Sequence, residues 1–199
     1  MKILLIGASG MIGRAVTPAL SLEHDVLTAS RSSGDFQVDI SDPVSLRALF
    51  ASTGPLDAIV SLAGGGVMAQ LSSMSDDDFD RTLDTQMKGQ LNVLRLGLEV
   101  VAPGGSITLT SGAAAQNPMP STSAIAASCA AIEAFMRTAA TEVEQVRLNV
   151  VSPIFVKESM ALFGLPTESG LSAADTAKSY LAAVNGTMHG QVLATPDYA

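Results

Sequence analysis

Three glycines near the start of the chain, Gly7, Gly10 and Gly13, have the spacing of a loop that accepts phosphate groups. An apolar run of strand length, residues 2–6, leads into them, and apolar residues at helical spacing follow. A Cβ would hold the backbone away from a pyrophosphate, whose oxygens must reach the free N–H groups at the helix start. The segment therefore predicts dinucleotide binding. The alternative is a tight strand–helix packing turn that binds nothing.

Few other residues in the sequence are candidates for a nucleophile, a metal ligand or an acid–base group. Cys129 could act as a nucleophile, but a cysteine among alanines is typical of an inert core residue. The acidic run 76–78 is interpreted as a helix start and a solvated surface, and no metal ion is predicted. His24 and His189 are expected at the surface or in turns. The glycine loop is therefore the strongest functional signal in the sequence.

The length and composition favour a single domain, 1–199, with a core of aliphatic side chains. The chain has 199 residues, of which 47% are hydrophobic and 4% aromatic. This length is enough to bury a sound core, and aliphatic side chains suit layered α/β packing. The formal net charge of -8 argues against a nucleic-acid partner, because phosphate backbones require a cationic surface.

No segment of the sequence predicts export or membrane insertion. The single cysteine rules out an internal disulfide and fits a reducing compartment. The first apolar run leads directly into the glycine loop, unlike a signal peptide. Residues 100–132 carry no formal charge, but the prolines and glycines among them exclude a spanning helix. We therefore expect a soluble, cytoplasmic protein without a membrane partner.

Strands and helices alternate along the chain. Apolar runs predict strands at 2–6, 25–30, 36–38, 58–62, 106–111, 147–151 and 191–194. Helices are predicted directly after the glycine loop, after Asp42, and over 77–101, 121–143 and 172–184, with a loop over 152–170. Too few residues separate the second and third strands for an ordinary crossover helix.

Local signals mark where the predicted elements begin. Asp42 and Pro43 supply an N-cap and a first helical residue, and Ser75 caps the long helix ahead of three aspartates. The segment 103–105 is expected to turn the chain into the strand at 106–111. Because most strands are apolar throughout, they predict an α/β fold with a doubly wound parallel sheet covered by helices on both faces. Ligands bind such sheets at the carboxyl ends of the strands, where the glycine clusters lie.

Several segments, in order, resemble the short-chain dehydrogenase/reductase superfamily over nearly the whole chain. They are the glycine loop, Asp39-Ile40, Ala63-Gly64, Gly105-Ser106-Ile107, the run from Arg147 to Pro153, and the run from Gly190 to Leu193. The resemblance implies a single-domain Rossmann fold of about seven strands in the order 3-2-1-4-5-6-7. The glycine spacing is closer to that of the extended and atypical branches of the family than to that of its short-form members.

The resemblance also implies a nicotinamide cofactor. Its implied binding residues are Gly7, Ser9, Gly10, Met11, Ile12, Gly13, Arg31, Asp39, Ile40, Ala63 and Gly64. In this family the residue after the second strand separates the two cofactors. Arg31, between Ser30 and Ser32, offers a planar cation and two hydroxyls to the extra phosphate, so NADP(H) is predicted over NAD(H). Asp39 would hold the adenine amino group and Ile40 would pack on the ring. The alternatives are an arginine that covers the adenine and an aspartate that forms a turn.

The catalytic residues of the family have no counterparts in this chain. On alignment, the tyrosine and lysine of the family fall on Ile125 and Cys129, its serine on Gly112 and its asparagine on Gln86. Hydride transfer to a carbonyl develops negative charge on oxygen, which must be protonated or stabilised, and an isoleucine can do neither. Ser111 is the remaining catalytic candidate, although an unassisted serine hydroxyl is a poor proton donor.

Other side chains near the expected site offer little replacement. Tyr180 and Tyr198 lie near the C-terminus and cannot simply stand in for the missing tyrosine. The loop after the sixth strand is shorter than in typical members of the family. Apolar side chains in it could form a small lid suited to a small or apolar ligand, namely Met160, Leu162, Phe163 and Leu165.

Three functions stay open from the sequence. The first is an NADP(H)-dependent oxidoreductase that acts on a small carbonyl or alcohol substrate through a non-standard active site. The second is a non-catalytic NADP(H)-binding sensor or regulatory subunit, since binding uses backbone N–H groups and Arg31 whereas chemistry needs other side chains. The third is an isomerase or lyase that uses bound cofactor without net turnover. Small residues and the pairing habit of the family predict a homodimer or homotetramer through helices 77–101 and 121–143.

Overall fold

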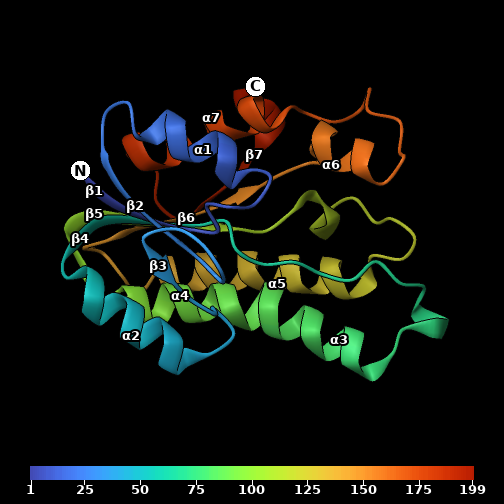
Figure 1. Ribbon diagram of the computed structural model, residues 1–199, viewed down its shortest axis with the longest axis horizontal. Coiled ribbons are helices and arrows are strands. Elements are labelled where there is room, and N and C mark those ends of the chain that lie inside the picture. The colour runs from blue at the N-terminus through green and yellow to red at the C-terminus, as the bar shows by residue number, and fades with distance from the viewer.

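Seven parallel strands form one sheet in the order β3-β2-β1-β4-β5-β6-β7 in the computed structural model, which describes residues 1–199 (Figure 1). The strands are β1 (Lys2–Ile6), β2 (Asp25–Ser30), β3 (Phe36–Gln37), β4 (Leu56–Ser61), β5 (Val101–Thr110), β6 (Arg147–Ser152) and β7 (Gln191–Ala194). This order confirms the predicted doubly wound Rossmann sheet. The order reverses between β1 and β4, which pair directly, and β1 also pairs with β2.

Helices cover both faces of the sheet. Helices α1 (Gly13–Leu20) and α7 (Ala173–Asn185) lie together on one face, and α2 (Pro43–Thr53), α3 (Asp76–Thr82), α4 (Gly89–Gly97) and α5 (Ser123–Ala140) lie on the other (Figure 1). Alternate side chains of β1 enter the two apolar clusters: Leu4 and Ile6 one, Ile3 and Leu5 the other. All four are fully buried, as a central parallel strand requires.

Two predicted helix starts are confirmed by their caps. The Asp42 side chain accepts a hydrogen bond from the Val44 N–H at 2.9 Å, with Pro43 in the first turn. The Ser75 hydroxyl accepts from the Asp78 N–H at 3.1 Å. Both contacts satisfy N–H groups that a helix start otherwise leaves unpaired. No helix lies between β2 and β3, which also agrees with the prediction.

The predicted helix over 77–101 is shorter than expected and is not uniform. It consists of α3, a π-helical segment η2 (Leu83–Lys88) and α4, and it ends at Gly97. Strand β5 begins at Val101 instead of 106, because Val101 pairs with Leu56 before the register shifts. The segment predicted as a turn, 103–105, is thus an irregularity within the strand. Helix α5 spans Ser123–Ala140, inside the predicted 121–143.

The loop predicted over 152–170 contains a short helix, α6 (Lys157–Leu162). An isolated bridge between Val156 and Leu171 closes the base of this loop. The Glu158 carboxylate accepts a hydrogen bond from the Ala173 N–H at 3.0 Å, which ties α6 to the start of α7. The prediction was wrong here because these contacts join residues that no local pattern connects. No helix of the chain combines the length and apolar character needed to cross a membrane.

Candidate functional site

A pocket of about 490 Å³ lies at the carboxyl ends of β1, β2 and β4, as predicted for a doubly wound sheet. Most of the predicted cofactor residues line it, namely Gly7, Ser9, Gly10, Arg31, Asp39, Ile40, Ala63 and Gly64. Met11, Ile12 and Gly13 do not line it and instead form the end of the turn and the start of α1. The structure therefore brings four separate segments of the sequence together around one cavity.

The turn between β1 and α1 requires glycine for packing reasons. Gly7 has a φ of +94°, and a Cβ there would lie 2.6 Å from the Ala63 backbone nitrogen. A Cβ on Gly13 would collide with the carbonyl oxygen of Gly7. The Gly7 carbonyl accepts from the Gly10 N–H at 3.0 Å, which closes the turn. Close approach of the backbone therefore explains both glycines, as expected for a tight strand–helix packing turn. The same turn also borders the pocket.

At the start of α1 the Ile12 and Gly13 N–H groups have no hydrogen-bond partner, whereas the Arg14 and Ala15 N–H groups donate to the Gly10 and Ile12 carbonyl oxygens at 3.0 Å. The N-cap residue of α1, Ile12, makes no side-chain cap hydrogen bond, and the first turn contains no acidic residue. The first N–H groups of a helix have no partner within the helix, and the helix dipole favours an anion beside them. The turn and the helix start together can therefore accept a phosphate group.

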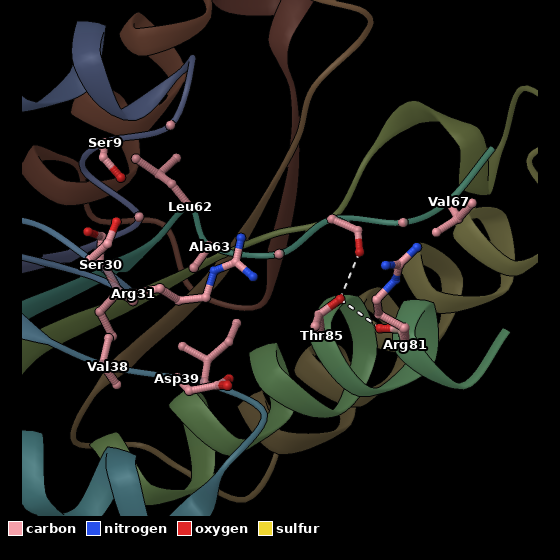
Figure 2. Close-up of a pocket in the computed structure, with 18 residues that line it drawn as sticks. Ser9, Ser30, Arg31, Val38, Asp39, Leu62, Ala63, Val67, Arg81 and Thr85 are labelled. Atoms are coloured by element: carbon pink, nitrogen blue, oxygen red, sulfur yellow. Dashed lines mark hydrogen bonds between the residues drawn. The ribbon is translucent and has the colours of Figure 1, made fainter. Parts of the chain in front are cut away.

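Arg31 stands on a loop that its neighbours hold in place. The Ser30 hydroxyl donates to the Ser33 carbonyl oxygen at 2.6 Å, and the Asp35 carboxylate accepts from the Thr28 N–H and hydroxyl at 2.8 Å. These two hydrogen bonds lower the pKa of Asp35 below its ordinary value. In Figure 2 the Arg31 guanidinium reaches across the pocket toward Ala63. A fixed loop thus presents a cation in an otherwise acidic protein.

Asp39 and Ile40 form the floor of the same end of the pocket. Asp39 Oδ1 accepts from the Ser41 N–H at 2.9 Å and from the Ser41 hydroxyl at 2.6 Å, so the aspartate does shape a turn. Its side chain is also exposed in the pocket, as Figure 2 shows. Ile40 packs over Gly89 at the start of α4, where a Cβ would lie 2.6 Å from Ile40 Cδ1. Asp39 can therefore form a turn with Ser41 and still present its carboxylate to a ligand in the pocket.

The pocket extends past the predicted residues to Gly65, Gly66, Val67, Arg81 and Thr85. The Thr85 hydroxyl donates to the Gly65 carbonyl oxygen at 2.7 Å, and the Thr82 hydroxyl accepts from the Val67 N–H at 3.0 Å. These bonds fix the glycine segment 64–66 to the helix (Figure 2). Sequence reasoning missed Thr85 because periodicity gave no sign of the π-helical segment η2, and it missed Arg81, in α3, because no local pattern joins it to the segment 64–67. Segments of π-helix often occur at functional sites.

The positions that align with the family's tyrosine and lysine lie in apolar surroundings. The Ile125 side chain occupies the space where a Cβ on Gly66 would project. Cys129 is buried, with its sulfur 4.0 Å from Gln86 Nε2. Burial, and secondarily the charge of Glu133, raise the pKa of the Cys129 thiol to about 11. The thiol is thus neutral at physiological pH, in agreement with an inert core cysteine.

The remaining hydroxyls near the end of β5 already have partners. The Ser111 hydroxyl donates to Glu133 Oε1 at 2.9 Å. The Tyr180 hydroxyl lies 2.9 Å from Thr110 Oγ1 on the α7 face of the sheet, and complete burial raises the pKa of Tyr180. Tyr180 is part of the core cluster beneath α7 and does not line the pocket. Tyr198 bonds weakly to the Met188 sulfur.

The two histidines lie outside the pocket. His24 Nε2 contacts Asn185 Oδ1 at 2.9 Å. His189 differs from the surface or turn residue that was expected, since it is half-buried and both ring nitrogens have partners. Its Nδ1 accepts from the Leu148 N–H at 3.0 Å, and its Nε2 lies 2.9 Å from the Ala140 carbonyl oxygen. His189 therefore joins the end of α5 to β6 and has a structural role.

Comparison with known proteins gives consistent matches. A family model described as enoyl-(acyl carrier protein) reductase matches residues 18–189. A tetrahydroxynaphthalene reductase from Pestalotiopsis fici is 31% identical over 163 residues, which cover 77% of this chain and 59% of that protein. A short-chain dehydrogenase/reductase, ATR9, from Stachybotrys chlorohalonatus is 31% identical over 199 residues, 84% of this chain and 78% of that protein. The chain thus spans about three fifths of the first of these relatives.

Solved structures match over almost the whole chain. The protein lin1944 from Listeria innocua has a TM-score of 0.93 and 34% identity, with 98% of each chain covered. A small-chain dehydrogenase in complex with NADPH has a TM-score of 0.87 and 28% identity, with 98% of this chain and 95% of that chain covered. These similarities agree with the strand order described above.

Proposed function

The chain belongs to the short-chain dehydrogenase/reductase superfamily, a superfamily of oxidoreductases, and on this premise we propose that it is an NADP(H)-dependent oxidoreductase. Its proposed substrate is a small carbonyl compound or alcohol, converted at a non-standard active site. The observation that carries the proposal is the pocket that joins the glycine turn, Arg31 and Asp39. Its donors suit a dinucleotide, which carries phosphates along its length.

The residues present fit the cofactor. A Cβ at Gly7 would lie 2.6 Å from the Ala63 backbone nitrogen, and a Cβ at Gly64 would lie 2.7 Å from Gln86 Oε1. We propose that the turn 7–13 holds the pyrophosphate and that Asp39 and Ile40 hold the adenine. Ala63 and Gly64 would lie against the adenosine. Gly7, Ser9 and Gly10 of the turn border the pocket, as do Asp39, Ile40, Ala63 and Gly64, which supports the assignment.

The preference for NADP(H) over NAD(H) depends on Arg31. A guanidinium offers a planar set of donors that matches a phosphate group, whereas an acidic residue here would favour the free ribose hydroxyls of NAD. The loop contacts of Ser30 and Asp35 hold the backbone of Arg31 beside the pocket, so little backbone freedom is lost on binding. A solved structure that is 28% identical contains NADPH, which supports the same choice.

When bound, NADP(H) supplies or accepts a hydride. The chain must then bind the substrate, exclude water and handle a proton at the substrate oxygen. Ile125 cannot exchange a proton, and the Cys129 thiol is neutral with a pKa of about 11. The proposed chemistry therefore depends on polar groups other than the tyrosine and lysine of the family.

A non-catalytic NADP(H)-binding sensor or regulatory subunit is the second candidate. The specific observation in its favour is the contact of Ile125 with the glycine segment, which replaces an acid with an apolar side chain at the expected reaction centre. Cofactor binding does not use this position. Loss of the acid therefore leaves the binding half of the site intact.

Titration with NADPH and NADH, followed by a screen of carbonyl and alcohol substrates at the nicotinamide absorbance, tests both candidates. We expect tight NADPH binding and turnover of at least one substrate. Tight binding without any turnover would favour the sensor. Absence of binding to either nucleotide would exclude both candidates.

We also propose that the protein is cytoplasmic and forms a homodimer or homotetramer through α3–α4 and α5. A single cysteine, buried and unpaired, supports a reducing compartment. Phe79 of α3 and Phe135 of α5 are large apolar side chains that stay exposed, 43% and 37% respectively, which supports contact with another copy.

A further inference from the structure

Glu133 is an ionisable residue on the same face of α5 as Ile125 and Cys129, the positions that align with the tyrosine and lysine of the family. Ile125, Cys129 and Glu133 follow one another at intervals of four residues, which places them on one face of the helix. Glu133 is 2% exposed and Ser111 is 5% exposed. A charge so deeply buried needs partners, because its removal from water is costly.

Glu133 has these partners at the end of β5. Its Oε1 accepts from the Ser111 hydroxyl at 2.9 Å, and its Oε2 accepts from Gln116 Nε2 at 2.6 Å. Arg137, one turn further along α5, lies 3.6 Å from Oε2. These contacts orient the carboxylate toward Ser111, which directly follows β5 at the carboxyl edge of the sheet.

A hydroxyl that donates to a carboxylate differs from an isolated hydroxyl. Its oxygen gains electron density, and the carboxylate can take its proton when the oxygen receives another proton. The Ser111 N–H donates to the Val151 carbonyl oxygen at 2.9 Å, which fixes the backbone of Ser111 beside β6. Gly112 follows and adds no side chain over the hydroxyl.

We propose that Ser111 is the catalytic hydroxyl and that Glu133 exchanges its proton, in place of the missing tyrosine and lysine. In alcohol oxidation, the substrate O–H bond breaks and its proton moves to Ser111 Oγ, while the original proton of Ser111 moves to Glu133. The substrate C–H bond breaks with its electron pair, which the oxidised cofactor takes up, and the carbonyl double bond forms. Glu133 then releases the proton to water past exposed Gln116 and Arg137. Carbonyl reduction reverses each step.

This inference rests on the proposed oxidoreductase function. Its central test is Glu133→Gln, which keeps the size of the side chain and an acceptor for the Ser111 hydroxyl but cannot take a proton. We expect kcat to fall by about a hundredfold or more, as when a general acid–base group is lost. The dissociation constant for NADPH is expected to stay within twofold of that of the wild type. Glutamine keeps one acceptor but loses the second, which binds Gln116 Nε2, so a merely structural role for Glu133 would appear as a loss in the free energy of unfolding instead of a loss confined to kcat.

Two further variants complete the kinetic test. Ser111→Ala is expected to lose as much kcat as Glu133→Gln, and the double variant to lose no more than either, because the two side chains act as one unit. Glu142→Gln, in an exposed residue just beyond α5, is the matched control and should keep full activity.

A readout without cofactor or substrate tests the same contact. Infrared difference spectra of the cofactor-free protein, wild type minus Glu133→Gln, isolate the carboxyl band of Glu133. We expect Ser111→Ala to shift this band, because the hydroxyl no longer donates to it. An unshifted band would contradict the contact between Ser111 and Glu133, independently of the kinetic measurements.

The outcomes separate this inference from the proposed function. Full turnover by Glu133→Gln would overturn the proton exchange and leave the oxidoreductase proposal intact. Wild-type protein that binds NADPH but converts no alcohol or carbonyl would overturn both in favour of the sensor. Absence of NADPH binding would overturn the cofactor assignment itself.

Discussion

Arg31 owes its position to short-range hydrogen bonds within its own loop. The Ser30 hydroxyl and the Asp35 carboxylate bond to groups between residues 28 and 33, so the loop is ordered by residues close in sequence. Asp35 has a pKa below its ordinary value of 3.8, so its contacts stabilise the folded protein above that pH. Their contribution is lost as the pH falls through the lowered value.

Arg31→Asp is expected to weaken NADPH binding and to favour NADH relative to NADPH. Loss of a hydrogen bond to a charged group corresponds to about 1.5–3 kcal/mol, roughly ten- to hundredfold in affinity. Fluorescence titration with both nucleotides measures the change. Arg95→Asp, in an exposed residue bonded to Asn92 and outside the pocket, is the control. An unchanged preference in Arg31→Asp would remove Arg31 from the site.

Cys129 is expected to resist alkylation in the folded protein. Burial raises the pKa of the Cys129 thiol from its ordinary value of 9.0 to about 11, so the reactive thiolate is scarce below pH 11. Iodoacetamide labelling followed by mass spectrometry should show little reaction at pH 8 in buffer and rapid reaction in urea. The folded protein should also lose stability as the pH rises above 9, where the unfolded thiol ionises first. Rapid labelling at pH 8 in buffer would contradict the inert assignment.

The site residues that the sequence predicts follow strands directly, whereas the residues that it misses make contacts with residues distant in sequence. Gly7, Arg31 and Asp39 stand directly after strands, so the strand pattern places them at the same edge. Glu133 reaches Ser111 across 22 residues, and its place on α5 resembles that of any buried helix residue in the sequence. No spacing rule could join the two before the packing of α5 on β5 was known.

At the scale of elements, the unit of β1, turn and α1 is the most constrained part of the site. Gly13→Ala places a methyl group against the Gly7 carbonyl oxygen, which is backbone and cannot move aside alone. We expect a loss of about 1–3 kcal/mol in the free energy of unfolding, together with weaker NADPH binding. Urea denaturation measures the first effect and fluorescence titration the second.

Gly65→Ala is the matched control for this change. A Cβ on Gly65 meets nothing within 4 Å, and its backbone is not in the left-handed region. Its free energy of unfolding should therefore stay within about 0.5 kcal/mol of that of the wild type. Equal destabilisation by the two variants would mean that the close approach of Gly13 to Gly7 has no special importance.

Elements with a local signal were predicted, and elements that depend on distant contacts were not. The N-caps at Asp42 and Ser75 mark helix starts by chemistry that lies within four residues. In contrast, η2 depends on hydroxyls that bond across to the segment 64–67, and α6 depends on the bridge between Val156 and Leu171. The site residues Arg81 and Thr85 were missed for the same reason.

At the scale of the whole molecule, the predicted association of copies is open to direct measurement. Sedimentation should show a dimer or tetramer, because α3 and α5 expose phenylalanines on the face away from α1 and α7. Phe135→Asp should shift the protein toward monomer, since burial of a charge in an apolar interface is costly. Leu22→Asp, at a side chain that is 85% exposed beside α1, is the control. Monomer alone at every concentration would exclude the assembly.

The lengths of the outermost strands have a consequence for the behaviour of the protein at high concentration. β3 has 2 residues and β7 has 4, and these lie at the two margins of the sheet. A foreign strand that aligned with either margin would find few unpaired amide and carbonyl groups to extend. The architecture thus discourages fibril growth by strand addition between molecules, even though the central strand β1 is apolar and fully buried from Ile3 to Ile6.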